Sequence, residues 1–146
     1  MDPHERRLPA DLDMRNNLAR ILIGIVFLWN IQCAVVFLFL PERYAPQFQL
    51  SGAIGEAMIQ GTGVLFLMWN VPYAVALWNP TRHRLSLYEA ITMQAIGFIG
   101  ETIIWLGLPP GYILASNSLA RFMIFDVAGL LLLVVAAWIN RTARSD

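Results

Sequence analysis

Four long apolar stretches constrain this chain more than any other feature of its sequence. Each is at least as long as the roughly 20 residues that an α-helix needs to cross about 30 Å of hydrocarbon. Only 14% of the residues are charged, whereas soluble domains usually carry about 25%. The sequence therefore predicts an all-α polytopic membrane protein with four transmembrane helices. The predicted spans cover about residues 18–40, 53–78, 85–108 and 119–139.

The connections between the predicted spans are short and contain proline or glycine, which are common where helices end. Short links place successive helices antiparallel, so we expect an up-down-up-down bundle. Residues 18–140 then form a single transmembrane domain, flanked by an N-terminal segment, residues 1–17, and a tail, residues 141–146. Pro72 lies inside the second span and removes one backbone donor, so a bend is expected there.

The arginines predict the orientation of the bundle, because cytoplasmic loops of membrane proteins are enriched in basic residues. The segments that share one side in this topology are the N-terminal segment, the second connection and the tail. Both termini are therefore predicted to be cytoplasmic, and the first span is expected to be an uncleaved anchor. The cytoplasmic side would carry Arg6, Arg7, Arg15, Arg20, Arg82, Arg84, Arg141 and Arg144, and the outer side Arg43 and Arg121.

Charge and composition exclude several classes of function. The formal net charge is zero and there is no basic run, which argues against nucleic-acid binding. Cys33 is the single cysteine, so an internal disulfide or a CxxC redox pair is impossible. His4 and His83 lie in polar segments, and neither a metal site nor a built-in cofactor is expected. A quinone or a membrane lipid remains open as a bound molecule.

Polar residues inside the spans are the main clue to function, because ionisable groups in hydrocarbon are costly and usually face the bundle interior. In three of the spans they recur at steps of three and four residues, which places them on one helical face. These faces are Glu56, Gln60, Gly63, Leu67, Asn70 and Ala74; then Gln94, Gly97 and Glu101; and then Phe122, Asp126, Gly129, Leu133 and Ala136. Asn30 adds an amide half-way along the first span.

The predicted orientation places several of these groups in the outer half of the bundle. We therefore expect an outward-opening polar cavity lined by Glu56, Gln60, Glu101, Arg121 and Asp126, in which Arg121 neutralises Glu101 or Glu56. Asn70 and Gln94 are further candidate ligand-binding residues. The alternative is that these polar groups are structural and form interhelical hydrogen bonds of roughly 0.6 kcal/mol each.

Two segments carry a resemblance to a known family. The first span begins with Arg20-Ile21-Leu22-Ile23-Gly24, and Gly55-Glu56-Ala57-Met58-Ile59-Gln60-Gly61 opens the second span after an outer loop. This order resembles the DoxX-like family of small four-helix membrane proteins. The resemblance implies a cytoplasmic-membrane protein that is sometimes a subunit of a quinone-linked thiosulfate-oxidising or redox-protective complex. It marks Glu56 as a residue of interest and implies no defined catalytic residues.

Three classes of function follow as alternatives. The first is an accessory membrane subunit that binds a quinone, a lipid or a partner membrane protein. The second is an intramembrane enzyme, such as a lipid isomerase, with Glu56, Glu101 or Asp126 as acid and base. The third is a proton-coupled small transporter, which would have to form a homodimer to enclose a path. The first is the leading expectation, and a homodimer or a larger membrane complex is its expected assembly.

Overall fold

The computed structural model describes the backbone of residues 3–142 and the side chains of residues 13–141, and all of its regular structure is helical. The four long helices are α1 (Pro3–Phe39), α3 (Gly52–Trp78), α4 (Arg84–Gly107) and α5 (Ile113–Thr142). A short helix α2 (Pro41–Tyr44) and a 3-10 turn η1 (Ala45–Phe48) lie between α1 and α3.

All four long helices are long and apolar enough to cross a membrane. The candidate spans are Asp13–Phe39, Gly52–Trp78, Arg84–Gly107 and Ile113–Arg141. They coincide with the four spans that the hydropathy predicts, and α1 continues on the N-terminal side of its span as far as Pro3. The chain is therefore a multi-pass membrane protein, and the predicted four-helix bundle is confirmed.

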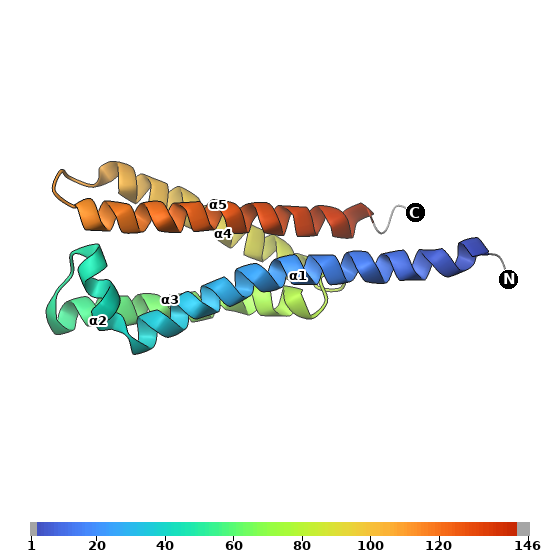
Figure 1. The fold of residues 1–146 in the computed structure, drawn as a ribbon, viewed down its shortest axis with the longest axis horizontal. Coiled ribbons are helices and arrows are strands. Elements are labelled where there is room, and N and C mark those ends of the chain that lie inside the picture. The colour runs from blue at the N-terminus through green and yellow to red at the C-terminus, as the bar shows by residue number, and fades with distance from the viewer. Residues whose placement is uncertain (1–2, 143–146) are drawn as a thin grey trace.

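The helices pack as two pairs, α1 with α3 and α4 with α5, and the start of α1 lies at the same end of the bundle as the end of α5 (Figure 1). We call this the terminal end, and the opposite end, where α2 and η1 lie, the loop end. Helix α4 begins beside the end of α3 and approaches α5 along its length. At the loop end α3 and α4 are therefore far apart (Figure 1).

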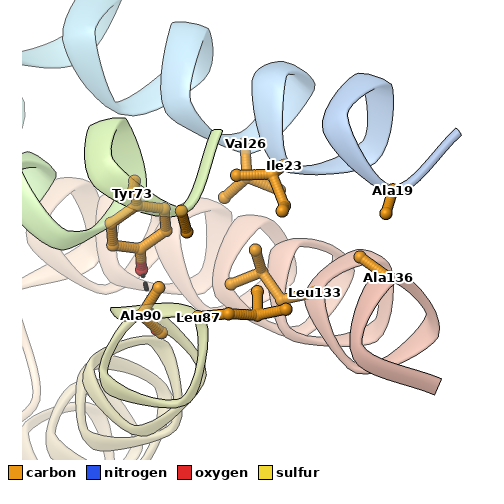
Figure 2. Close-up of a cluster of buried hydrophobic side chains, with 9 residues drawn as sticks. Ala19, Ile23, Val26, Tyr73, Leu87, Ala90, Leu133 and Ala136 are labelled. Atoms are coloured by element: carbon orange, nitrogen blue, oxygen red, sulfur yellow. Dashed lines mark hydrogen bonds between the residues drawn. The ribbon is translucent and has the colours of Figure 1, made fainter. Parts of the chain in front are cut away.

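The core of the terminal half contains side chains from all four long helices, which point toward one another between the helices (Figure 2). Small residues let the helices approach closely, as is usual in membranes. Tyr73 is the largest fully buried side chain in this cluster. Its members are Ala19, Ile23, Val26, Tyr73, Ala76, Leu87, Ala90, Leu133 and Ala136.

At the loop end, the segment formed by α2 and η1 covers the bundle, and hydrogen bonds attach it and the residue after it to α5 and to the turn before α5. Ser118 Oγ donates to the Gln47 carbonyl oxygen at 2.9 Å, and Gln49 Nε2 donates to the Gly111 carbonyl oxygen at 3.2 Å. Beneath the segment, aromatic rings of Tyr44 and Phe48 pack against Phe37 at centroid distances of 4.9 and 6.4 Å. The loop end is therefore closed by an ordered segment.

The contact between α1 and α3 depends on Gly63. A Cβ atom on this residue would lie 3.0 Å from the Ala34 carbonyl oxygen and 3.1 Å from the Leu38 amide nitrogen, both of which are backbone atoms of α1. We expect Gly63→Val to lower the free energy of unfolding by about 1–3 kcal/mol, because overpacking forces the backbones apart. Circular dichroism, recorded while the protein unfolds in mild detergent, measures this change.

Gly61→Val is the matched control for this variant, since no described atom lies within 4 Å of a Cβ at Gly61. Equal unfolding free energies for Gly61→Val and Gly63→Val would contradict the close approach of α1 and α3.

Candidate functional site

A hydrogen-bonded chain of three side chains crosses the middle of the bundle. The Tyr73 hydroxyl on α3 donates to Gln94 Oε1 on α4 at 2.6 Å, and Gln94 Nε2 donates to Asp126 Oδ1 on α5 at 2.7 Å. Tyr73 is fully buried and Gln94 is 3% exposed. Because the Tyr73 hydroxyl occupies the amide oxygen, the amide nitrogen of Gln94 is directed at Asp126.

Two glycines provide the space for this chain of bonds. A Cβ on Gly97 would lie 2.5 Å from Asp126 Oδ2, and a Cβ on Gly129 would lie 2.9 Å from Gln94 Nε2. On each helix the glycine follows the polar residue by three positions, and the helices are antiparallel. Each polar side chain therefore lies against the glycine of the facing helix, which explains how an amide and a carboxyl fit between closely packed helices.

A cavity of about 290 Å³ lies next to Asp126 and is bounded mainly by α3 and α4. Several of its lining residues, among them Leu65, Ile96 and Ile104, are more than half exposed on the outer surface of the bundle. The cavity therefore opens sideways, between α3 and α4, on a surface that faces hydrocarbon in a membrane. The lining residues are Asn30, Thr62, Leu65, Phe66, Trp69, Gln94, Ile96, Gly97, Gly100, Glu101, Ile104 and Asp126.

Glu101 supplies the second carboxyl of the cavity. It lies six residues before the end of α4 at Gly107, which corresponds to about 9 Å along the helix axis. Its Oε2 atom is buried and has no hydrogen-bond partner within the part of the chain that the structure describes. Glu101 and Asp126 are close enough to interact electrostatically. The two carboxyls thus differ in environment, because Asp126 accepts a hydrogen bond from Gln94.

Three of the seven residues proposed from the sequence as ligand-binding, Gln94, Glu101 and Asp126, line this cavity. Asn70 is buried but is not part of its lining. Its amide nitrogen donates to the Phe66 carbonyl oxygen at 2.7 Å, and its Oδ1 has no partner among the described residues.

The other three residues lie outside the cavity, contrary to the lining expected from the sequence. Glu56 is half-buried in the first turns of α3, and Gln60 is exposed and donates to the Leu38 carbonyl oxygen at 3.2 Å. Arg121 is exposed and donates to Gln47 Oε1 at 2.7 Å and to Ser118 Oγ at 3.0 Å. The expected pairing of Arg121 with Glu101 or Glu56 is therefore replaced by neutral partners in η1 and α5.

The inner face of α3 also differs from the predicted one. Gly63 and Asn70 are buried as expected, but Gln60, Leu67 and Ala74 are exposed. The face that packs inside is displaced by one residue along part of the helix and consists of Gly55, Ile59, Gly63, Asn70, Tyr73 and Ala76. The predicted set keeps the helical period, because Glu56 and Ala74 are 18 residues, or five turns, apart, whereas the buried face shifts around the helix by about 60° between Gly55 and Ala76.

Sequence reasoning did not assign Tyr73 to the site, and it noted Asn30 as an intramembrane amide without naming it a ligand-binding candidate. Tyr73 resembles an aromatic anchor at the membrane surface, yet its hydroxyl is buried and donates to Gln94. Asn30 is 5% exposed and lines the cavity from α1. Spacing could have indicated Tyr73, because it follows Asn70 by three positions and therefore lies on the same face of the helix.

Among residues 13–141, no three His, Cys, Asp or Glu side chains are close enough together to hold a metal ion. The site is thus a carboxyl- and amide-lined cavity. No family model matches the chain, and no curated protein or solved structure matches it. What the site does therefore has to be inferred from its geometry.

Proposed function

We propose that this protein binds a lipophilic molecule, which enters the cavity between α3 and α4 directly from the bilayer. The observation that supports this proposal is a cavity with apolar residues at its lipid-facing opening and two carboxyls on its inner wall. Ligand sites are typically apolar concavities with a few convergent polar groups, and this cavity has that composition. Intramembrane carboxyls in such a position are functional candidates by default.

The biological setting of this binding is part of the same proposal. The termini share one end of the bundle, and the excess of arginine at that end favours a cytoplasmic location for both. An accessory subunit of a membrane complex remains the preferred role. The resemblance of the Gly55–Gly61 segment to the DoxX-like family favours a quinone-linked complex, although Glu56 lies outside the cavity.

An intramembrane acid–base enzyme is the second candidate, favoured by the unlike environments of the two carboxyls. Asp126 accepts a hydrogen bond from Gln94, whereas Glu101 Oε2 has no donor among the described residues. Carboxyl pairs in different environments commonly divide the roles of acid and base. This candidate predicts chemical conversion of an extracted lipid, which is lost in Glu101→Gln and in Asp126→Asn.

The test of lipophile binding is a variant that fills the cavity. No described atom lies within 4 Å of a Cβ at Gly100, which lines the cavity, so Gly100→Leu places a side chain in its space without a clash at Cβ. We expect this variant to fold normally. The amount of the molecule that co-purifies with the wild type should fall at least about tenfold in the variant, which corresponds to about 1.4 kcal/mol of binding free energy. Mass spectrometry of extracts from protein in mild detergent measures the amount.

Gly61→Leu is the matched control, because Gly61 also has open space around its Cβ and lies on α3 outside the cavity. Equal amounts of every co-purifying lipophile in wild type, Gly100→Leu and Gly61→Leu would contradict the proposed function.

A further inference from the structure

The inner wall of the cavity presents mainly hydrogen-bond acceptors, and this selects among lipophilic ligands. Glu101 Oε2 is buried without a described partner. Asp126 Oδ1 accepts from Gln94, while Oδ2 lies beside Gly97, which is itself a lining residue. Glu101 Oε2 therefore lacks a donor within the described part of the chain, and a ligand can supply one.

Two of the polar donors that line the cavity, Gln94 and Thr62, are already engaged. Gln94 uses its amide nitrogen for Asp126, and the Tyr73 hydroxyl prevents the amide from turning its oxygen toward the cavity. Thr62 donates its hydroxyl to the Met58 carbonyl oxygen of its own helix at 3.0 Å. A ligand that offers only acceptors, such as a quinone carbonyl, would therefore meet acceptors at the carboxyl wall.

Neither carboxyl has a cationic neighbour in the described part of the chain. The cavity lining contains no Arg, Lys or His, and no ion pair to Glu101 or Asp126 occurs among residues 13–141. Arg121, which the sequence suggested as the counter-charge, is bound to Gln47 and Ser118 instead. A positive charge that complements this wall has to come with the ligand.

The aromatic side of the cavity fits the same ligand. Phe66 and Trp69 of α3 line the cavity opposite the α4 residues Gly97 and Glu101. Aromatic rings attract an ammonium group through their negative faces, and the attraction is stronger away from water. Carboxyl oxygens on one side and aromatic rings on the other are a favourable setting for an organic cation.

We propose that the ligand is a lipophilic amine, bound as an ammonium whose N–H groups donate to Glu101 and Asp126. Its apolar part extends through the opening beside Leu65, Ile96 and Ile104 into the bilayer. This inference rests on the proposed function and specifies its ligand class. It assigns Tyr73 and Gln94 as positioning residues that keep Asp126 oriented as an acceptor.

The test compares three probes on the purified wild-type protein in mild non-ionic detergent, with native mass spectrometry to count 1:1 adducts during titration. The probes are dodecylamine, which is protonated at neutral pH, dodecanol, which has the same chain and no charge, and a short-chain ubiquinone. We expect dodecylamine to bind at least about tenfold more tightly than dodecanol or the quinone. In the double variant Glu101→Gln/Asp126→Asn, dodecylamine should bind about as tightly as dodecanol, so that the ratio of their dissociation constants falls to near one.

The outcomes separate the ligand class from the proposed function. If dodecanol or the quinone binds as tightly as the amine to the wild type, the amine class is wrong, and lipophile binding stands. If no probe binds better to the wild type than to Gly100→Leu, and nothing co-purifies with the wild type, both proposals fail. The wild-type comparison of charged and uncharged probes needs no variant, so a folding defect in the double variant does not affect it.

Discussion

Gly97→Val is expected to destabilise the protein by about 3 kcal/mol and to disrupt the cavity wall. A Cβ at this position would lie 2.5 Å from Asp126 Oδ2, so the carboxyl group has to move. Its displacement breaks the 2.7 Å hydrogen bond from Gln94 and leaves a buried amide donor unpaired. Overpacking and an unsatisfied buried polar group each cost about 1–3 kcal/mol. Thermal unfolding in mild detergent measures the effect.

Gly100→Val is the matched control on the same helix, because a Cβ there meets no described atom within 4 Å. This control should unfold close to the wild-type temperature while it narrows the cavity. If Gly97→Val and Gly100→Val unfold at the same temperature, Asp126 does not lie against Gly97 and the geometry of the site is wrong.

The second large effect is expected for Gln94→Leu. This change removes the donor to Asp126 Oδ1 in the interior of the bundle. The Tyr73 hydroxyl keeps a second acceptor, the Ala90 carbonyl oxygen at 3.1 Å, so the loss falls mainly on Asp126 (Figure 2). Loss of a hydrogen bond to a buried carboxyl is expected to cost about 2–3 kcal/mol of unfolding free energy.

A double-mutant cycle separates this bond from general packing. Removing both partners, in Gln94→Leu/Asp126→Ala, should cost clearly less than the sum of the two single changes, because no unpaired group is left behind. Strict additivity of the two changes would show that Gln94 and Asp126 do not interact.

The four-helix architecture was predictable because it depends on segment length and hydropathy. In a bilayer every backbone polar group has to be satisfied within its own helix or barrel, so long apolar stretches have few alternatives. The short connections then predict antiparallel neighbours. The ordered α2–η1 segment was not predictable in the same way, because its position depends on hydrogen bonds of Gln47 and Gln49 to residues more than sixty positions away.

The site was predictable in part for a similar reason. Gln94, Gly97 and Glu101 share a face of α4 by spacing alone, and the structure places all three in the cavity lining. Spacing does not show which helices separate to form a cavity, so the contribution of Trp69 from α3 could not be foreseen. Nor does it reveal that Arg121 finds neutral acceptors in a neighbouring segment rather than an acid.

Lipid access to the cavity carboxyls is the central claim, and chemical labelling in intact membranes tests it most directly. A hydrophobic carbodiimide reaches carboxyls from the bilayer, whereas a water-soluble carbodiimide reaches groups outside the spans, such as the exposed Glu42 of α2. Peptide mass spectrometry should show Glu101 modified by the hydrophobic reagent, with the modification strongly reduced in Gly100→Leu and unchanged in Gly61→Leu. The claim is contradicted if the hydrophobic reagent modifies neither Glu101 nor Asp126. It is also contradicted if both residues react only with the water-soluble reagent.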